Sequence, residues 1–592
     1  MSTKLIKDPV HGYIRVPKNY IKNIVDTCEF QRLRNIRQTS YDSLYPSSSH
    51  NRFIHSLGVY FLGNRAFKAL RNNVEKYIKK DENFWKKCKH TFEIACLLHD
   101  IGHTPFSHDG ENFLLVAKEE DTYQIMKKPF GQTETLQITK LYNDLLNVMQ
   151  KRLSADRFKE FGEDFSATIL GNNIPDKDKD KEKTTVVTVA KPHEIMSVIV
   201  ALETYESFLE QEKVDIELFA RAILGLQYRT SQNSDMGVYN AVIQMLNSSI
   251  IDVDRLDYIM RDTQMSGFDS TSIDIERLLD SVIIVQDEEK HYHFGYKKNA
   301  ISTIENVLLA HDAERRWIQG HPVVIYDSFL VKECLGATDK VYKVKNSNLG
   351  IFQKEAMTLE GVELDNGLKL RLINDGDCLF LIKQLYNNDC PYYVREYLAR
   401  DKRKSPIWKS EAEFKLVLGK LEDRQRKPFQ NIFKAKKEEK EATSIGNILN
   451  ATRIEEIKEE IEKYLSDETL GEEDKRYPVL IKQKQLFWLE KLEEYFTSKG
   501  MKFEIQNLTV NTFNSKIDEL SKGKVPIWFD SFGESKDISE VIKVYQTKSQ
   551  EKSSEDIKEM FYWFVEKNEQ YDQDDFLNFI KFTADEFDKE FK

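Results

Sequence analysis

The sequence predicts a mainly α-helical protein, and three observations support this prediction. Apolar residues occupy nearly every face of the segment 92–101, which is typical of a helix in the centre of a protein. Further segments with helical spacing follow at 193–212, 238–262 and 304–320. Beyond residue 400 the chain is rich in Lys and Glu, and 433–465 has the pattern of charged amphipathic helices.

The 592 residues are too many for one hydrophobic core, so several domains are expected. Gly102 and Pro105 end the central helix. Changes in composition divide the chain into a first core part at 1–115, an insertion at 116–190, a second core part at 191–345, a small α+β subdomain at 346–400 and a charged helical region for regulation or interaction at 401–592.

Two of these parts contain predicted strands. In the insertion we expect some helix, then a mobile loop at the alternating Asp/Lys run of "NNIPDKDKDKEKTTVVTV", and a short strand at 184–189. The segment 281–298, "SVIIVQDEEKHYHFGYKK", predicts a β-hairpin within the second core part.

The composition is that of a globular protein with a charged surface, with 40% hydrophobic and 31% charged residues. The net charge of −11 disfavours coating of nucleic acid. We expect no secretory signal, since the first 17 residues lack an apolar core, and no membrane span, since no run of 18 apolar residues occurs. The six cysteines are scattered without a C-x-x-C pair, which indicates reduced thiols in the cytoplasm.

The stretch "CLLHDIGHTPFSH" at 96–108 predicts a metal site. His99 and Asp100 are neighbours on the expected last turn of a buried helix, where an ionised carboxylate needs a compensating partner such as a divalent cation. His55, near the start of another helix, and Asp254, which follows an apolar run, complete a set of two histidines and two carboxylates. Such a set suits Mn, Fe, Zn, Ni or Mg and leaves positions open for water and substrate. The plainer alternative, strongest for His55 alone, is a helix cap or a satisfied core residue.

A second set of polar residues could supply proton transfer and phosphate binding. His103, His108 and His193 are candidate acids for a leaving oxygen, and Glu111 is spaced to orient His108. Arginine forks suit phosphate oxygens, and the candidates are Arg52, Arg255, Arg315 and Arg316, although solvated surface arginines are the plainer interpretation of the last two. The chain has no Walker loop and no G-x-G-x-x-G motif, so side chains and metal would hold any phosphate.

The segments "HNRFIHSLGV", "LLHDIGHTPFSH" and "IDVDRLDYIMRD", with the opening "IKDPVHGYIRV" and "FQRLRNIRQ", resemble the HD-domain deoxynucleoside triphosphate triphosphohydrolases. This family includes the bacterial dGTPases and the sterile-alpha-motif-and-HD dNTPases. The resemblance covers about residues 4–115 and 191–345. It implies a helical HD-domain core and a reaction that splits a dNTP into a deoxynucleoside and inorganic triphosphate.

The resemblance also implies roles for individual residues. His55, His99, Asp100 and Asp254 match the family's metal ligands; His103, His108 and His193 match its histidines near the α-phosphate, with His108 protonating the 5′ oxygen; Arg52, Arg255 and Tyr258 match phosphate contacts; Gln38 and Asp262 match contacts to the sugar 3′-hydroxyl. Asp26, Gln31 and Arg34 match residues that read guanine in a regulatory site between subunits.

The sequence departs from the family pattern at several positions. Lys7 and Tyr13 stand where guanine-activated members have Asn and His, and Glu111 replaces the usual Asp beside the acid histidine. Glu314 and Ile318 stand where the family has a His and a Tyr beside the sugar. These differences leave activation by guanine nucleotide, sugar discrimination and base preference open.

The expected function is therefore metal-dependent hydrolysis of dNTPs, with one divalent metal in each active site and further Mg carried by the nucleotide. A nucleotide activator and a homo-oligomer, dimer or tetramer, are the expected partners, and depletion of dNTPs against phage is a candidate role. The alternatives are an HD phosphodiesterase or nuclease acting on cyclic nucleotide or single-stranded DNA, and a nucleotide-sensing scaffold.

Overall fold

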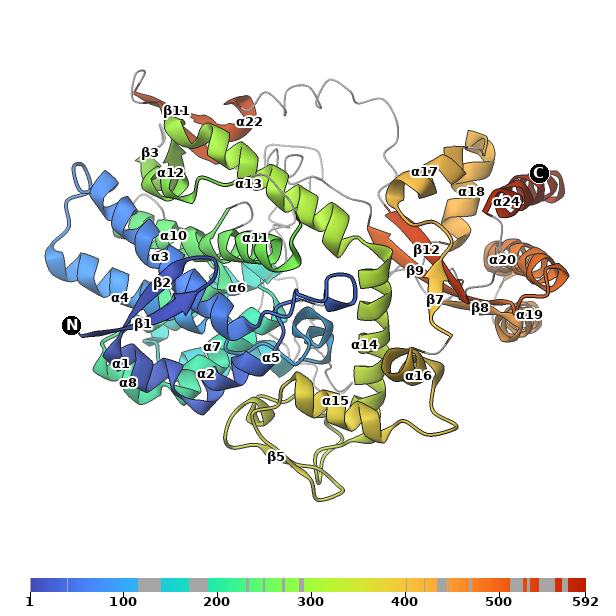
Figure 1. The fold of residues 1–592 in the computed structure, drawn as a ribbon, viewed down its shortest axis with the longest axis horizontal. Coiled ribbons are helices and arrows are strands. Elements are labelled where there is room, and N and C mark those ends of the chain that lie inside the picture. The colour runs from blue at the N-terminus through green and yellow to red at the C-terminus, as the bar shows by residue number, and fades with distance from the viewer. Residues whose placement is uncertain are drawn as a thin grey trace. The chain divides into compact units, whose positions relative to one another are not determined.

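The computed structural model describes residues 2–39, 41–114, 140–169, 190–229, 234–248, 251–268, 272–286, 292–400, 402–419, 421–433, 445, 447–467, 471–511, 525–529, 533–541, 559–566 and 573–591. The chain forms two compact units (Figure 1). Unit 1 contains residues 1–315, 328–394 and 515–552, and unit 2 contains 316–327, 395–514 and 553–592. The strand predicted at 184–189 lies outside the described residues.

Unit 1 is mainly helical, as the sequence predicts. Its helices are α1 (Lys18–Tyr20), α2 (Cys28–Arg32), α3 (Arg52–Val74), α4 (Glu82–Leu98), α5 (Lys140–Gln150), α6 (Ala155–Ile169), α7 (Pro192–Thr204), α8 (Glu206–Gln211), α9 (Ile216–Leu224), α10 (Ser234–Leu246), α11 (Val253–Ser266), α12 (Ile275–Asp280), α13 (Ile301–Glu314) and α15 (Asp375–Gln384). α14 (Pro322–Val341) and α16 (Tyr392–Ala399) each extend across a boundary of the two units.

The central helix α4 explains why the core forms where it does. Asp81 caps its start, where the Asp81 Oδ1 accepts a hydrogen bond from the N–H of Phe84 at 2.7 Å. From Phe92 to Leu98 every residue is buried, because α4 packs between α3 and α9. Gly63 of α3 allows the close approach, since a Cβ there would lie 2.6 Å from the Cys96 Sγ of α4. α11 packs on α3 and α7 packs on α9, so the helices that carry the polar motifs share this core.

Two small antiparallel hairpins and one longer sheet flank the helices of unit 1. β1 (Thr3–Asp8) pairs with β2 (Gly12–Pro17), and β5 (Val362–Glu363) pairs with β6 (Lys369–Leu370). The predicted hairpin at 281–298 is confirmed as β3 (Val282–Gln286) and β4 (Tyr292–Lys297). β10 (Pro526–Phe529) joins β4 in parallel and β11 (Glu534–Asp537) pairs with β10, so the order in this sheet is β11-β10-β4-β3 (Figure 1).

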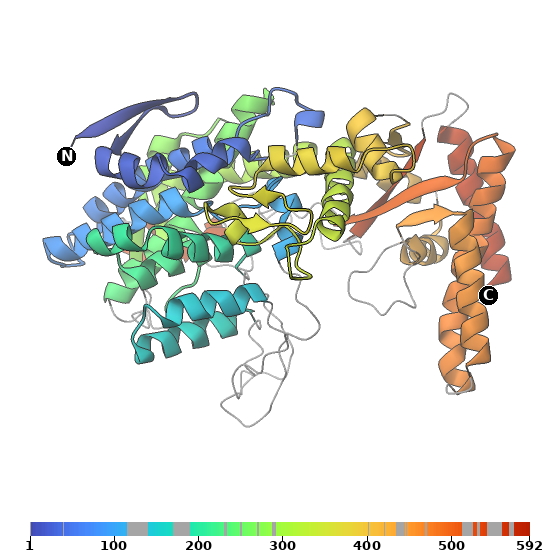
Figure 2. The same cartoon turned by 90° about the horizontal axis from the view of Figure 1, so that it is seen from below.

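Unit 2 combines helices with a four-stranded sheet that the sequence analysis did not predict. The strand order is β7-β12-β9-β8, formed by β7 (Lys404–Pro406), β12 (Glu559–Glu566), β9 (Glu504–Asn511) and β8 (Ile448–Asn450). Its helices are α17 (Glu411–Gly419), α18 (Asp423–Phe433), α19 (Ala451–Ser466), α20 (Glu472–Ser498) and α24 (Gln573–Glu590), whereas the short helix α22 (Ile538–Val541) belongs to unit 1. α19 and α20 lie side by side as a helical pair (Figure 2). The apolar run "MFYWFV" of β12 supplies the core of the sheet, where Trp563 contacts Trp408 and Phe433.

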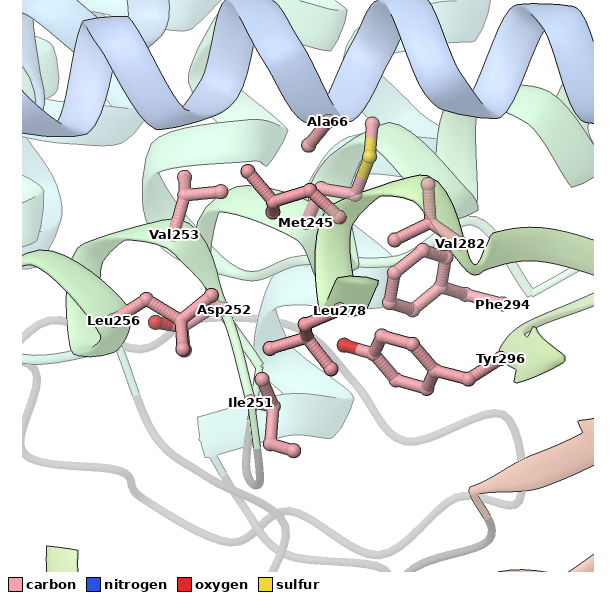
Figure 3. A pocket seen from close by; sticks show the side chains of 11 residues that line it. Ala66, Met245, Ile251, Asp252, Val253, Leu256, Leu278, Val282, Phe294 and Tyr296 are labelled. Carbon is pink, nitrogen blue, oxygen red and sulfur yellow. The ribbon is translucent and has the colours of Figure 1, made fainter. Parts of the chain in front are cut away.

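A pocket lined mainly by apolar side chains lies between α3, α10, α11, α12 and the β3–β4 hairpin (Figure 3). Its polar lining residues are Asp252 and Tyr296. Asp252 is the N-cap of α11, accepting hydrogen bonds from the N–H groups of Arg255 at 2.6 Å and Ser248 at 3.0 Å. The pocket therefore belongs to the packing that fixes the start of α11, and none of the predicted metal ligands lines it.

Two further predictions concern the cysteines and the membrane-spanning capacity of the helices. The six cysteines have free thiols, and five of them are buried. Within the described ranges, no helix combines the length and apolar character that a membrane crossing requires.

Gly58 provides a test of the packing between α3 and α11. A Cβ at Gly58 would lie 1.9 Å from the Asp257 Oδ1, and Asp257 is held by several donors, so the carboxylate has no room to move. We expect Gly58→Ala to lower the free energy of unfolding by about 2–3 kcal/mol through overpacking. The control is Gly336→Ala in α14, where the nearest atoms lie at 3.7 Å and no loss is expected. Denaturant titration followed by circular dichroism compares the two; equal midpoints would contradict the packing argument.

Candidate metal centre

The first helix turn of α3 places His55 inside the protein. Asn51 caps this helix, and its Oδ1 accepts a hydrogen bond from the N–H of Ile54 at 3.2 Å. His55 is completely buried, and its ring faces the end of α4, where it lies edge-on to His99 with the ring centroids 5.2 Å apart.

The end of α4 supplies His99 and Asp100. The sequence analysis placed both on the last helical turn, whereas α4 ends at Leu98 and His99 is its C-cap with helical backbone angles. Gly102 brings the following turn against α7, because a Cβ there would lie 2.3 Å from the Ser197 backbone nitrogen. The Gly102 N–H donates to the Ser197 Oγ at 2.9 Å, which fixes the chain directly after the two candidate ligands.

α11 supplies the fourth candidate ligand, Asp254, from its first turn. Its Oδ1 lies 2.8 Å from the His55 Nε2 and 3.7 Å from the His99 Nε2. The His55 and His99 Nε2 atoms are 3.4 Å apart. Asp100 completes the group, with Oδ1 3.4 Å from the His99 Nε2 and Oδ2 3.6 Å from the His55 Nε2. The structure thus brings together the four residues that the sequence predicts, from three helices.

Two hydrogen bonds orient the imidazoles so that both Nε2 atoms face this group. The His55 Nδ1 lies 2.7 Å from the Asp257 Oδ2, and the His99 Nδ1 lies 2.9 Å from the Cys96 carbonyl oxygen. Bonds of this kind fix the tautomer of a metal-binding histidine and increase its basicity. Ligand atoms of His55, His99 and Asp100 lie close enough together to hold a metal ion, and the Asp254 Oδ1 lies beside both imidazoles. A donor set of two imidazoles and two carboxylates suits a divalent cation.

Asp257, which was not selected from the sequence, binds three polar side chains at once. Its carboxylate is completely buried and lies against His55, the His11 Nε2 at 2.6 Å and the Arg261 guanidinium at 2.9 Å. Arg261 in turn donates to the Asp8 Oδ2 at 2.9 Å. The only signal in the sequence is that Asp257 follows Asp254 by three residues, which puts both on one face of α11.

The charges in the group compensate one another. Burial alone would raise the pKa of Asp100, but Arg52 and His99 hold it well below its usual range. Burial likewise opposes the charge on His55, but hydrogen bonds with Asp254 and Asp257 raise the pKa of His55 to about 9.

A second cluster surrounds Glu111. The Glu111 Oε1 lies 2.6 Å from the His108 Nδ1 and 2.7 Å from the His193 Nδ1. The His193 and His103 rings stack with centroids 4.0 Å apart, and the His103 Nε2 lies 3.3 Å from the Asp100 Oδ1, so the two clusters are continuous. Burial would raise the pKa of Glu111, but His193 and His108 hold it well below its usual range.

His108 differs from its neighbours because 58% of its side chain is exposed. Its Nδ1 faces Glu111, so its Nε2 is the ring atom available to a bound molecule. His103 and His193 are buried and are less suited to exchange protons with solvent.

Arg52 links the metal group to the loop that carries His108. Its Nη1 donates to the Asp100 Oδ2 at 2.9 Å, and its Nε donates to the Ser107 Oγ at 3.0 Å. Arg52 is buried, so in this structure it neutralises Asp100. The other predicted arginines lie elsewhere: Arg255 is half-buried beside Asp252 at the start of α11, Arg315 is half-buried at the end of α13, and Arg316 is exposed over the Trp317 ring.

A third buried polar group contains the predicted sugar-contacting residues. The Asp262 Oδ1 lies 2.6 Å from the Nε2 of His50, a residue that the sequence analysis did not select. Burial lowers the pKa of His50 and raises that of Asp262. Gln38 is buried, and its Oε1 has no hydrogen-bond partner among the described residues. Glu314, at the end of α13, is also buried and interacts with Asp262. The Tyr258 ring of α11 lies 6.4 Å from the His311 ring of α13.

The residues predicted to read a regulatory guanine lie on the N-terminal surface. The Arg34 Nε donates to the Gln31 Oε1 at 2.7 Å, and the Arg34 guanidinium covers the Phe53 ring at 3.6 Å. Asp26 is exposed at the C-terminal end of the π-helix Ile21–Val25, and the Gln31 Nε2 donates to the Val25 carbonyl at 2.6 Å. Nearby on the β1–β2 hairpin, Lys7 lies over the Tyr13 ring at 4.5 Å.

Residues 52–259 match the model of the HD domain family. Among curated proteins, an uncharacterised protein of Mycoplasma genitalium is 27% identical over 312 residues, covering 52% of this chain and 54% of its own length. The deoxynucleoside triphosphate triphosphohydrolase SAMHD1 of Danio rerio is 41% identical over 125 residues, which are 20% of this chain and 19% of that protein. The SAMHD1 homolog of Dictyostelium discoideum is 37% identical over 114 residues, which are 19% of this chain and 21% of that protein. The matched part of the chain thus spans about half of the length of the Mycoplasma relative and about a fifth of the length of the other two.

Two solved structures share the fold. A phosphohydrolase from Bacteroides thetaiotaomicron has a TM-score of 0.51 at 16% identity, with 95% of this chain and all of the other aligned. A hypothetical protein from Aquifex aeolicus has a TM-score of 0.50 at 16% identity, with 98% of this chain covered. The predicted fold class is confirmed: the chain is mainly helical with small sheets, and its residues 52–259 match the HD domain model.

Asp257 provides a test of the metal centre. In Asp257→Asn, one of the two carboxylate oxygens becomes an NH2 group that opposes the Arg261 guanidinium and either His11 or His55, which need an acceptor there. We expect Mn²⁺ to bind about 10–100-fold more weakly, measured by isothermal titration calorimetry. Asp274→Asn, at the N-cap of α12, is the control, because asparagine caps a helix equally well. Equal Mn²⁺ affinity of both variants would show that Asp257 does not support the ligands.

Proposed function

We propose that this protein is a metal-dependent phosphohydrolase and that its substrates are deoxynucleoside triphosphates. The observation that supports this most strongly is the continuity of the metal group with the His103–His108–Glu111–His193 cluster through Asp100. Cation-binding and proton-donating groups thereby flank one point, as phosphoryl transfer to water requires. The similarity of limited segments to the SAMHD1 triphosphohydrolases supports the choice of substrate.

Each group has a distinct part in the proposed reaction. His55, His99, Asp100 and Asp254 hold one divalent cation, which supplies positive charge for the α-phosphate oxygens. Water attacks the α-phosphorus, the bond to the 5′ oxygen breaks, and inorganic triphosphate and deoxynucleoside form. His108 gives its Nε2 proton to the departing 5′ oxygen, and Glu111 stabilises the imidazolium beforehand through Nδ1.

Other residues orient the nucleotide in this proposal. Arg52, Arg255 and Tyr258 contact phosphate oxygens, and Mg²⁺ accompanies the triphosphate. Gln38 and Asp262 bind the sugar 3′-hydroxyl, which suits the buried Gln38 Oε1, an atom without a hydrogen-bond partner in the part of the chain that the structure describes. Asp26, Gln31 and Arg34 belong to a nucleotide-activator site in a homo-oligomer, and dNTP depletion against phage is the proposed biological role.

The reaction is tested by incubating the full-length protein with Mn²⁺ and each dNTP, alone and in pairs, in H₂¹⁸O. We expect equimolar deoxynucleoside and triphosphate, with the ¹⁸O in the triphosphate because water attacks the α-phosphorus. Asp100→Ala should lose Mn²⁺ binding and product together. Release of orthophosphate or pyrophosphate would contradict the proposed bond cleavage. Turnover of cyclic nucleotide or single-stranded DNA, with no dNTP turnover, would favour the phosphodiesterase or nuclease alternative.

The role of His108 gives a separate prediction. We expect His108→Gln to lower kcat about 10²–10⁴-fold, the usual contribution of a positioned acid, because glutamine cannot donate a labile proton. Mn²⁺ affinity should not change, since the described contacts of the His108 ring are with Glu111, His103 and His193, and none of these is a candidate ligand of the metal group. His293→Gln on β4 is the control and should retain the wild-type kcat. If the His108 variant retains kcat while the Asp100 variant is inactive, the acid is a different residue.

A further inference from the structure

The loop that carries His108 has a backbone conformation that its own residues disfavour. Phe106 has φ +58° and Ser107 has φ +51°, so two consecutive residues with side chains adopt left-handed angles. Such angles are uncommon outside glycine and asparagine, and a bulky residue such as Phe106 requires support from its surroundings.

Asp375 provides this support from a distant part of the chain. It is the first residue of α15 in the subdomain at 346–400. Its Oδ1 accepts a hydrogen bond from the Phe106 N–H at 2.7 Å, and its Oδ2 accepts one from the Arg37 N–H at 2.9 Å. One carboxylate therefore joins the strained loop to the segment that contains Gln38.

A second connection ties the same segments together. The buried Arg32 guanidinium donates to the carbonyl oxygens of Ile101 at 2.8 Å, His103 at 2.9 Å and Ile373 at 2.9 Å. The Arg32 guanidinium thus connects the segment before α15 with the turn after α4. This leaves Asp375 to hold the far end of the loop, two residues before His108.

The loop that carries His108 is connected to the metal group as well as to the Glu111 cluster. The Ser107 Oγ donates to the Arg37 carbonyl and accepts from the Arg52 Nε at 3.0 Å, and Arg52 pairs with Asp100. A shift of the loop would move the His108 ring directly, whereas His55, His99 and Asp254 lie on other segments.

We propose that Asp375 is a positioning residue that clamps the Phe106–Ser107 turn and thereby sets the place of His108. Its effect on catalysis rests on the proposed function, whereas its effect on the loop does not. The subdomain at 346–400 is then part of the catalytic architecture through this one carboxylate.

The matched control lies two residues further along α15. Asp377 is also a first-turn carboxylate, but its Oδ2 accepts a hydrogen bond from the Asn374 N–H at 2.9 Å within the helix cap. Asp377→Asn removes the same charge from the same helix end. Asp375→Asn in addition replaces one acceptor of the clamp by a donor that opposes a backbone N–H.

The first measurement is hydrogen–deuterium exchange of peptides covering 101–110, which needs no substrate. We expect exchange at Phe106 to be at least tenfold faster in Asp375→Asn than in wild type and unchanged in Asp377→Asn. The second is hydrolysis of dNTP with Mn²⁺. In Asp375→Asn, kcat should fall about 10–100-fold, since small misplacements of a catalytic group have effects of this size. KM and the Mn²⁺ Kd should stay within threefold.

Asp375→Glu covers the case in which the asparagine variant does not fold. It retains the charge and both acceptor oxygens but displaces them by one methylene, so kcat should again fall with Mn²⁺ affinity retained. Wild-type exchange at Phe106 in both Asp375 variants would overturn the clamp. Fast exchange with unchanged kcat, or an equal loss of kcat in Asp377→Asn, would overturn the positioning role. If wild type hydrolyses no dNTP, the proposed function fails, and the exchange data alone decide on the clamp.

Discussion

The site depends on the buried carboxylate of Asp257. An ionised carboxylate without exposure is stable only when several donors surround it, and here His11, His55 and Arg261 do so. Gly58 permits this arrangement by removing the side chain that would occupy the space of the carboxylate. In this way one residue joins the N-terminal hairpin, α3 and α11, and it also determines which nitrogen of His55 faces the metal group. Replacing any of these donors would leave charge in the core uncompensated.

The exposure of the side chains increases from the centre of the metal group to the loop that carries His108. His55 and Asp257 have no exposed side-chain surface, Asp254 is 35% exposed, and the His108 ring is 58% exposed. Groups that hold a cation need a fixed geometry, and burial among tightly packed helices provides it. A group that exchanges protons needs contact with solvent or substrate, and a loop at the surface provides that. The order therefore follows the different demands of binding a cation and of transferring a proton.

The sequence alone was sufficient for the helical class, the β3–β4 hairpin and the convergence of His55, His99, Asp100 and Asp254. Adjacent polar residues at the end of an apolar helix are a strong local signal, and motif resemblance connected the distant ones. Asp257, His50 and Asp375 were missed because their partners lie 202, 212 and 269 residues away, and no local pattern indicates such pairs. The sheet of unit 2 was missed for a related reason. Its strands are far apart in a charged region, and β7 and β8 have only three residues each, so their pairing was not evident from the sequence. The apolar run of β12 is a local signal that was not used.

The position of β10 has a consequence for the biosynthesis of the chain. Residues 526–529 pair with β4, whose residues 292–297 are made more than 200 residues earlier. Gly295 is adapted to this neighbour, because a Cβ there would lie 2.3 Å from the Pro526 carbonyl oxygen. During synthesis on the ribosome, β4 is therefore an unpaired strand edge while the following 200 residues are added. The sheet of unit 1 is completed only after residues 526–537 have been made, so a nascent chain has to keep this edge from pairing with other strands until β10 emerges.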